Sequence, residues 1–313
     1  MNDLPGLGAL GISFETADAR RPARDVVTEY YRRYEDHFGL AVVRPVVVTG
    51  VTRIASGFIV ATSSPAYGDH TTQARVVVNA TGTWGAPFIP HSPGARTFRG
   101  RQVHTSEYVQ AEDYAGARAI VVGGGTSAVG FMLELEGIAD TLTWATRRPV
   151  DWVGSENLNL EAAVAAVATQ DEAARAGRVL PSIVSGTGIP VTPRICGGID
   201  RGVLVARPLF TNIEPEGVRW PDGTFTAADV IIWATGFRPE LRHLAPLKLR
   251  AESGGLMVAA GQSRADPDIF LAGYGPQAST IGANRAGRVI ARQVVARLAE
   301  QHTSAPNSVD PEA

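Results

Sequence analysis

A glycine-rich run near the middle of the chain has the spacing of a dinucleotide-binding loop. Residues 123–128 read Gly-Gly-Gly-Thr-Ser-Ala, which is Gly-x-Gly-x-x-Ala, between a predicted strand and a predicted helix. There the first glycine permits a tight turn, the second lets the backbone approach a pyrophosphate, and the alanine lets the helix pack closely on the strand. Backbone N–H groups at the helix N-terminus then face the phosphates. We therefore expect a dinucleotide to bind at Gly123, Gly125, Thr126, Ser127 and Ala128.

Two consecutive arginines indicate which dinucleotide this loop binds. The second strand of such a unit ends about 20 residues after the glycines, where an acid binds the ribose of NAD and an arginine binds the 2′-phosphate of NADP. Here Arg147 and Arg148 follow the predicted strand, with Arg147 placed 24 residues after Gly123, and no acid stands at the strand end. Two guanidinium groups can form charge-assisted hydrogen bonds to a phosphate, so the sequence predicts NADPH. The alternatives are a glycine-rich turn without a ligand and arginines that are simply solvated.

The elements around the loop predict a parallel sheet. Residues 119–122 predict a strand, residues 126–136 a helix and residues 142–145 a second strand, and together they form a βαβ unit. A parallel sheet is covered on both faces. We expect the domain that contains it to begin near Gly116.

Apolar spacing and turn residues outline the rest of the chain. They predict helices over residues 24–38, 161–176 and about 280–300, the last with Ser279 as its N-cap. Three β-rich runs, 45–54, 58–62 and 74–80, alternate with turn residues as in a meander. Residues 221–223 predict a turn between two strands, and residues 229–234 and 269–272 predict buried strands.

The composition excludes several classes of protein. The 313 residues are 44% hydrophobic with a formal net charge of −2 and no long basic stripe, so we expect no nucleic-acid partner. No apolar run approaches the roughly 20 residues that span a bilayer, so we expect no membrane partner. A single cysteine fits a reducing compartment, so we expect a cytoplasmic protein. Cys196 is the one cysteine and forms no redox pair or zinc cluster, and the histidines show no metal-ligand spacing. Lys248 is the one lysine, which excludes a Gly-Lys-Ser/Thr phosphate loop.

Further motifs surround the glycine loop in a fixed order. They are Ala80-Thr81-Gly82, then Phe98-x-Gly100-x-x-x-His104-x-x-x-Tyr108 before the loop, and Ala234-Thr235-Gly236-Phe237 and the run 269–275 after it. This order resembles that of flavin-containing monooxygenases and Baeyer–Villiger monooxygenases. Over residues 4–298 the chain is similar to bacterial members of the flavoprotein group with two dinucleotide-binding domains. For His104 and Tyr108, a structural pair is the alternative interpretation.

The resemblance implies an α/β fold in which a Rossmann-like NAD(P)-binding domain is inserted in an incomplete FAD/NAD(P)-binding domain. The implied parts are a partial FAD-binding domain (1–115), an NADP(H)-binding domain (116–239), a return segment of the FAD-binding domain (240–300) and a disordered tail (301–313). The implied activity is hydride transfer from NADPH to FAD, followed by oxygenation of a small-molecule substrate. The residues that would border the flavin or the domain hinge are Thr81, Gly82, Thr235, Gly236, Gly273, Tyr274 and Thr280. His104 would link the domains without acting as an acid or base.

One part of the family pattern is missing. Members of the group begin with a strand, a Gly-x-Gly-x-x-Gly loop and a helix that hold FAD, whereas Gly6, Gly8 and Gly11 follow no predicted strand. The chain is then either a truncated product or a flavin-free relative. A non-catalytic NADP(H)-binding module is the alternative function, and a flavin-linked disulfide reductase is excluded because Cys196 has no second cysteine. A sheet without its central strands would expose an apolar edge, which favours pairing with another chain, as in a homo-oligomer.

Overall fold

The chain divides into two compact units. The computed structural model describes residues 21–154, 160–181, 188–278 and 283–303. Unit 1 consists of Met1–Gly82, Asp171–Leu180 and Leu241–Ala313, and unit 2 of Thr83–Gln170 and Pro181–Glu240. Compactness thus groups residues 83–115 with unit 2, whereas the family pattern assigns them to the first domain, so the domain boundaries stay a prediction.

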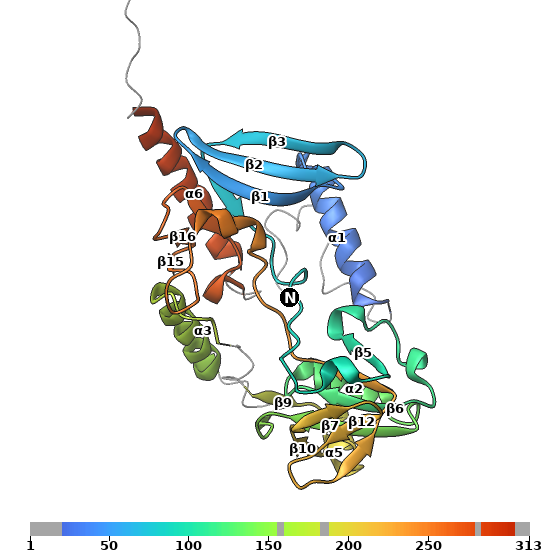
Figure 1. Ribbon diagram of the computed structural model, residues 1–313. Helices are drawn as coiled ribbons and strands as arrows, with labels where there is room; N and C mark the ends of the chain where they lie inside the picture. The colour runs from blue at the N-terminus through green and yellow to red at the C-terminus, as the bar shows by residue number, and fades with distance from the viewer. Residues whose placement is uncertain (1–20, 155–159, 182–187, 279–282, 304–313) are drawn as a thin grey trace, which may run out of the picture. The chain divides into compact units, whose positions relative to one another are not determined.

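A five-stranded parallel sheet forms the centre of unit 2 (Figure 1). In spatial order its strands are β10 (Ala206–Pro208), β7 (Thr141–Thr146), β6 (Arg118–Val122), β14 (Val230–Trp233) and β5 (Arg101–His104). Unit 2 also contains β8 (Trp152–Gly154) paired with β9 (Ile189–Val191), and helix α5 (Pro193–Asp200). Helix α3 (Leu160–Arg175) begins in unit 2 and ends in unit 1.

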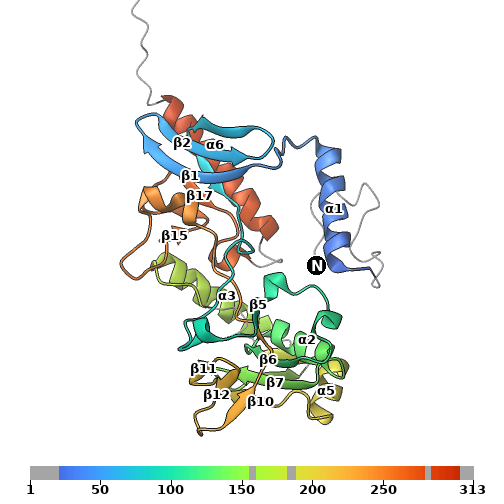
Figure 2. The same cartoon turned by 45° about the vertical axis from the view of Figure 1, so that its right-hand side comes forward.

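Both faces of this sheet are covered. Val121 and Ile232 pack in one cluster with residues of helix α2 (Thr126–Leu135), which lies beside β6 and β7 in both ribbon views (Figures 1 and 2). Ile120 and Ile231 pack on the other face against an antiparallel meander, β11 (Asn212–Glu214), β12 (Gly217–Arg219) and β13 (Phe225–Ala227). Successive residues of a strand point to opposite faces, so a strand covered on both sides is apolar throughout. The predicted βαβ unit and parallel sheet are confirmed, with a meander as the second cover.

An ion pair fixes the starts of the two central strands of unit 2. The Arg118 guanidinium donates to both carboxylate oxygens of Asp229, at 2.9 Å and 2.6 Å, and the Arg118 backbone N–H donates to the same carboxylate at 2.9 Å. These hydrogen bonds lower the pKa of Asp229 to about 2. The carboxylate therefore stays ionised, and it sets the register of β6 against β14 at the edge opposite the glycine-rich loop.

Unit 1 contains two smaller sheets. Strands β1 (Val47–Ile54), β2 (Gly57–Ser64) and β3 (Gly68–Ala74) form an antiparallel meander. The other sheet has the order β15 (Val258–Ala259), β16 (Gln262–Ser263), β17 (Ile269–Leu271) and β4 (Val77–Asn79), with β17 and β4 parallel. Unit 1 also contains helix α1 (Ala23–Phe38), whose C-cap Gly39 is in the left-handed conformation, and helix α6 (Ala283–Thr303).

The third strand of the predicted meander differs in the structure. The sequence predicts it over residues 74–80, but β3 ends at Ala74, and Val77–Asn79 pairs with β17 in the other sheet. Strand β3 is polar and almost fully exposed, so it shows no apolar alternation. This strand forms because its backbone pairs with β2. Its side-chain pattern therefore gives no signal from which a strand could be predicted.

The last helix also differs from its prediction. It runs to Thr303, so residues 301–303 of the predicted disordered tail are helical. The reason is a hydrogen bond from the Gln301 amide to buried Asp268 at 2.7 Å. Asp268 also binds Arg53 of β1 at 2.8 Å and Arg297 of α6 at 2.6 Å. Residues Ser279 and Thr280 and those after Thr303 lie outside the described residues.

Candidate dinucleotide-binding site

The glycine-rich loop joins strand β6 to helix α2 in unit 2. Gly123 has a φ of +146°, and a Cβ there would lie 2.2 Å from the carbonyl oxygen of Ala234 on the adjoining chain segment. This position therefore accepts glycine alone. Gly124 is exposed, and a Cβ there would meet only the Thr146 side chain, at 4.0 Å. The loop thus has a closed side, which packs on the sheet, and an open side, which faces solvent.

The open side presents hydrogen-bond donors without partners. Gly125 is the N-cap of α2 and supplies no side-chain cap. Within the described parts of the chain, the backbone N–H groups of residues 124–127 have no acceptor. Thr126 and Ser127 are exposed, whereas Ala128 is fully buried and packs against the sheet. Free N–H groups at a helix N-terminus form an anion site, so this geometry matches the phosphate cradle expected from the sequence.

Trp144 holds the loop in place, a role that the sequence did not reveal. Its indole N–H donates to the carbonyl oxygen of Gly123 at 2.7 Å, and the Gly123 N–H donates to Ala145 at 2.9 Å. The Trp144 ring is 1% exposed and lies on β7. The sequence predicts only a packing residue at this position, because the bond to Gly123 depends on the register of β7 against β6.

The paired arginines lie at the same edge of the sheet as the loop. Strands β6 and β7 are parallel neighbours, and Arg147 and Arg148 follow directly after β7. Both side chains are exposed, and in the described parts of the chain neither forms an ion pair. Arg207 on the next strand, β10, is different, because its guanidinium lies 4.1 Å from the Trp220 ring centroid and 3.4 Å from an Asp222 oxygen. Arg147 and Arg148 are therefore available to an anion, whereas the neighbouring Arg207 is already paired.

His104 is buried in unit 2 and both of its ring nitrogens are hydrogen-bonded. Nδ1 lies 3.1 Å from the Ser106 backbone N–H, and Nε2 lies 2.9 Å from the Gly236 carbonyl oxygen. An N–H donor at Nδ1 and a carbonyl acceptor at Nε2 assign the proton to Nε2. The ring also contacts Phe237 edge-on, with 4.8 Å between centroids. These bonds lie within unit 2, and a linking role for His104 stays a prediction.

The rest of the Phe98 to Tyr108 motif packs in unit 2 as well. Phe98 is 9% exposed, and a Cβ on Gly100 would lie 2.6 Å from the Phe98 ring and 2.4 Å from the Asp229 carbonyl oxygen, which explains the glycine. The Tyr108 ring stacks on Tyr114, and its hydroxyl donates to Glu134 at 3.2 Å. Burial, and then the Glu134 carboxylate, raise the pKa of Tyr108, so it stays protonated.

The two Ala-Thr-Gly motifs follow strands in different units. Thr81 and Gly82 follow β4 in unit 1, where Thr81 donates to the Asn79 side chain at 3.2 Å. Thr235 and Gly236 follow β14 in unit 2, and the Thr235 hydroxyl donates to the Phe88 carbonyl. Phe88 in turn donates its N–H to Gly236 at 3.0 Å. In unit 2 the motif is therefore hydrogen-bonded to Phe88, which lies a few residues after Thr83, where unit 2 begins.

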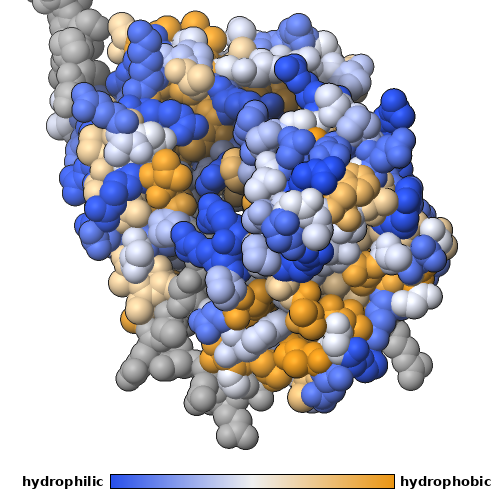
Figure 3. All heavy atoms as spheres, turned by 60° about the horizontal axis from the view of Figure 1, so that its bottom comes forward, coloured by the Kyte–Doolittle hydropathy of each residue, from blue (hydrophilic) through white to orange (hydrophobic). Residues whose placement is uncertain are grey.

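Large apolar side chains of unit 2 reach the surface. The Trp84 side chain is 65% exposed, and its ring stacks on Phe237 with 5.2 Å between centroids. Val109 and Val205 of unit 2 are 64% and 66% exposed. Figure 3 shows hydrophobic side chains gathered among polar ones on one face of the molecule. The rings of His104, Phe237 and Trp84 therefore contact one another in turn, from the buried His104 to the exposed Trp84.

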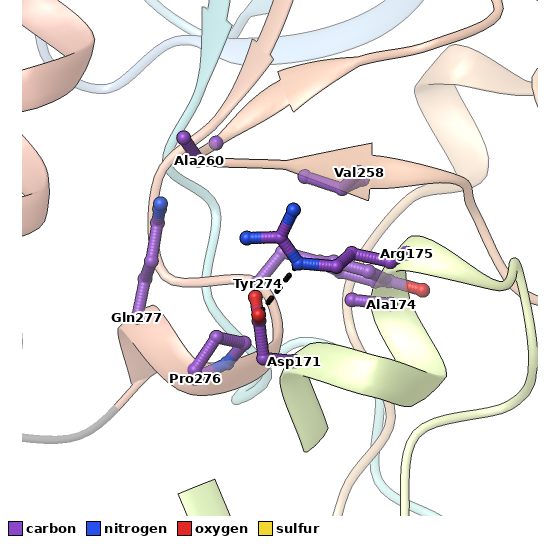
Figure 4. A pocket seen from close by; sticks show the side chains of 9 residues that line it. Asp171, Ala174, Arg175, Val258, Ala260, Tyr274, Pro276 and Gln277 are labelled. Atoms are coloured by element: carbon purple, nitrogen blue, oxygen red, sulfur yellow. Dashed lines mark hydrogen bonds and ion pairs between the residues drawn. The ribbon is translucent and has the colours of Figure 1, made fainter. Parts of the chain in front are cut away.

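Of the residues expected to border a flavin in unit 1, Tyr274 lines a small hollow (Figure 4), whereas Thr81, Gly82 and Gly273 do not line it. Gly273 is exposed, whereas Tyr274 is 6% exposed and its hydroxyl accepts the Leu256 N–H at 3.0 Å. The hollow beside Tyr274 measures about 60 Å³, and the Asp171–Arg175 ion pair lies at its side. Sites for organic ligands measure about 300 to 1,000 Å³, so this hollow does not fit an isoalloxazine ring.

The described residues contain neither a metal cluster nor a helix fit to cross a bilayer. Within them, no group of three or more histidine, cysteine, aspartate and glutamate side chains could hold a metal ion. Nor does any described helix combine the length and the apolar character that crossing a membrane requires.

The chain matches a known family over its first half. Residues 6–167 match the family model described as pyridine nucleotide-disulphide oxidoreductase. An indole-3-pyruvate monooxygenase of Oryza sativa subsp. japonica, YUCCA4, is 26% identical over 206 residues, which are 55% of this chain and 45% of that protein. A Baeyer–Villiger monooxygenase of Streptomyces coelicolor is 37% identical over 83 residues, which are 26% of this chain and 16% of that protein. The matches thus span less than half the length of these two relatives.

A solved structure is similar over most of its length. The flavin-containing monooxygenase from Stenotrophomonas maltophilia superimposes with a TM-score of 0.72 and 30% identity, over 90% of this chain and 79% of that one. The likeness covers both units and agrees with the motif order of the sequence. By its family match and this structural likeness, the chain belongs to the pyridine nucleotide-disulphide oxidoreductase family and, within it, to the flavoproteins that resemble flavin-containing monooxygenases.

Proposed function

We propose that unit 2 binds NADPH and that the chain acts as an NADPH-dependent oxidoreductase of the monooxygenase-like type on a small-molecule substrate. One observation carries the proposal. The unpaired N–H groups of residues 124–127 and the unpaired guanidinium groups of Arg147 and Arg148, all within the described part of the chain, lie at the same edge of one parallel sheet. NADPH has a diphosphate and a separate 2′-phosphate, and each set of donors suits one of these groups.

The two sets of donors divide the recognition between them. The loop donors are backbone groups at a helix N-terminus, so they bind the diphosphate of NADPH and of NADH alike. The arginine forks carry fixed positive charge and suit a phosphate dianion, which NADH lacks at the ribose. The preference for NADPH therefore depends on Arg147 and Arg148, and the loop sets the affinity for both cofactors.

The flavin of the family would accept the nicotinamide hydride and activate dioxygen when bound. In unit 1, the hollow at Tyr274 is about 60 Å³ and does not fit a flavin ring. A second candidate function is an NADP(H)-binding module without its own flavin, and the two candidates share the NADPH site.

Titration of the chain with NADPH and NADH, followed by cofactor fluorescence, tests the NADPH site. We expect tighter binding of NADPH, and each change of Arg147→Gln or Arg148→Gln should weaken NADPH binding by about tenfold or more while NADH binding is unchanged. Arg194→Gln is the control, because Arg194 is an exposed arginine of the same unit. Equal affinity of the unsubstituted chain for the two cofactors would contradict the proposal.

A second measurement separates the oxidoreductase from the binding module. The chain is equilibrated with FAD, separated from free FAD by gel filtration, and assayed for NADPH oxidation with oxygen uptake. Flavin that stays with the chain and supports NADPH oxidation favours the oxidoreductase. NADPH binding with neither bound flavin nor oxidation favours the module.

A further inference from the structure

Three arginines on one face of helix α6 have no counter-charge among the described residues. Arg285, Arg288 and Arg292 are exposed, and within the described parts of the chain none forms an ion pair or a side-chain hydrogen bond. Their spacing of three and four residues places them on the same face of the helix. At 1.5 Å per residue, they extend over about 10 Å of the helix axis. We call these three residues the arginine stripe.

Several other helical arginines of this chain are neutralised. Arg32 pairs with Asp36 and Arg33 with Glu29 on α1, and Arg175 pairs with Asp171 on α3. On α6 itself, Arg297 pairs with Asp268 and Glu300. By contrast, residues 283–299 of α6 contain no acidic residue at all. The arginine stripe therefore differs from these helical arginines, because it has no acidic side chain nearby on its own helix.

The arrangement is unfavourable without an anion. Like charges three or four residues apart on a helix destabilise it by about 0.2 to 0.5 kcal/mol for each pair. The stripe contains two such pairs, Arg285 with Arg288 and Arg288 with Arg292. A bound anion removes this repulsion and adds charge-assisted hydrogen bonds.

The arginine stripe lies on an open part of the surface. It borders an open region that is lined by Asn284, Arg285, Arg288, Val289 and Arg292, all of them residues of helix α6. The three guanidinium groups are therefore accessible to a ligand from solvent. A helix that lies on a membrane combines basic residues with bulky aromatic or leucine side chains. Helix α6 has no aromatic residue apart from His302, its one leucine, Leu298, is half-buried, and the apolar side chain that lines the open region is Val289.

We propose that the arginine stripe binds an oligophosphate, that is, a ligand with two or more linked phosphate groups. Guanidinium forks bind phosphate oxygens in pairs, and three of them along the helix match a chain of charged phosphates better than they match a single anion. The site belongs to unit 1, whereas Arg147 and Arg148 belong to unit 2. The proposal is therefore independent of NADPH binding.

Isothermal titration of the full chain with tripolyphosphate tests the proposal. The Arg147→Gln/Arg148→Gln chain is used with saturating NADH, so that neither the two arginines nor the glycine-rich loop of the expected NADPH site contributes. We expect one binding site, which Arg288→Gln weakens by about tenfold and the combined change of Arg285, Arg288 and Arg292 to glutamine weakens by about a hundredfold or more. Arg264→Gln is the control, because Arg264 is an exposed arginine of the same unit. Circular dichroism of each variant checks that it is folded.

Two further probes identify the source of the phosphates. ATP that binds more tightly than tripolyphosphate indicates a nucleotide, and equal binding indicates an inorganic oligophosphate, and both results support the proposal. Vesicles of phosphatidylserine are titrated in the same way. Binding to vesicles without binding to tripolyphosphate would overturn the proposal in favour of a membrane surface. Unchanged tripolyphosphate binding after loss of all three arginines would overturn it as well.

Discussion

Two pairs of neighbouring parallel strands, β6 and β7 in unit 2 and β4 and β17 in unit 1, differ in the chain segments that begin at their carboxyl ends. In unit 2, β6 leads into a helix whose first N–H groups are free among the described residues, and β7 leads into two exposed arginines. In unit 1, β4 leads into Thr81 and Gly82, and β17 leads toward Tyr274, whose ring is buried in the core. Parallel strands alone therefore do not make a binding edge, because the next element decides whether the edge stays open.

The two units also differ in how the chain builds them. The core of the unit 2 site comes from one continuous βαβ stretch, residues 118–146. Unit 1 joins segments from both ends of the chain, and Asp268 ties them together by binding Arg53 of β1 and Arg297 of α6. We therefore expect the stability and NADPH binding of unit 2 to depend most on the geometry of its glycine-rich loop. We expect the stability of unit 1 to depend most on the buried Asp268 carboxylate.

The largest effect is expected at the closed side of the glycine-rich loop. In Gly123→Ala, the new Cβ would lie 2.2 Å from the Ala234 carbonyl oxygen, at a φ of +146° that alanine rarely adopts. The clash and the backbone strain should destabilise the fold by about 4 kcal/mol and abolish NADPH binding. Denaturant unfolding and NADPH titration measure both effects. Gly130→Ala is the control, since it lies inside α2 with no atom within 4 Å, and it should stabilise by about 0.5 to 1 kcal/mol.

The next effect concerns the carboxylate of unit 1. The Asp268 side chain is 3% exposed and pairs with two arginines. In Asp268→Asn, both guanidiniums lose their nearer, buried counter-charge and keep only the carboxylates of Asp266 and Glu300, so the free energy of unfolding should fall by about 2 to 4 kcal/mol. Asp266→Asn is the control, because Asp266 lies 3.6 Å from the more exposed Arg53 and should cost less than about 1 kcal/mol. Equal effects at the two positions would contradict this view of unit 1.

The same carboxylate sets a pH dependence. Burial by itself raises the pKa of Asp268, but hydrogen bonds from Arg297 and Arg53 outweigh it and hold the pKa below its ordinary value. The unfolded chain has a pKa of about 3.9 there, so the stabilisation is complete above that pH and is lost as the pH falls through the folded-state value. The stability difference between the unsubstituted chain and Asp268→Asn should therefore shrink below about pH 4. A difference that stays constant down to about pH 2 would argue against the carboxylate as its source.

A smaller effect is expected at His104. In His104→Ala, the bonds to Ser106 and Gly236 are lost, and stability should fall by about 2 kcal/mol. NADPH affinity should stay within a few-fold, because the ring bonds lie outside the glycine-rich loop. Slower turnover with unchanged NADPH affinity, measured together by steady-state kinetics and titration, would support the predicted linking role. Ser106→Ala keeps the backbone N–H donor to Nδ1 and serves as the milder control.

The sequence could predict what depends on neighbouring residues. The βαβ unit, the ends of α1 and α3, and the family are all indicated by spacing within short stretches of chain. The bond from Trp144 to Gly123 could not be predicted, because it needs the register of two strands that are brought together by folding. The Asp268 cluster was missed for a similar reason, since Arg53 and Asp268 are 215 residues apart. Strand β3 was misplaced because its polar side chains do not alternate.

The smallest effect tests a local turn in unit 1. Strands β15 and β16 are joined by Ala260 and Gly261, which both have positive φ values, 50° and 86°. A two-residue hairpin turn of this type favours asparagine followed by glycine, because asparagine tolerates the left-handed conformation better than alanine does. Ala260→Asn should therefore raise the free energy of unfolding by about 0.5 to 1 kcal/mol, whereas Ala260→Val should lower it by at least as much. Ala260 is exposed, so neither side chain has to enter the core.

Denaturant midpoints of the two variants measure the difference, and a valine variant as stable as the asparagine variant would mean that the turn is not strained. This turn leads into β16, which pairs with β17, so its strain lowers the stability of unit 1. The NADPH site lies in unit 2, so NADPH affinity should be the same in the unsubstituted chain and in both variants.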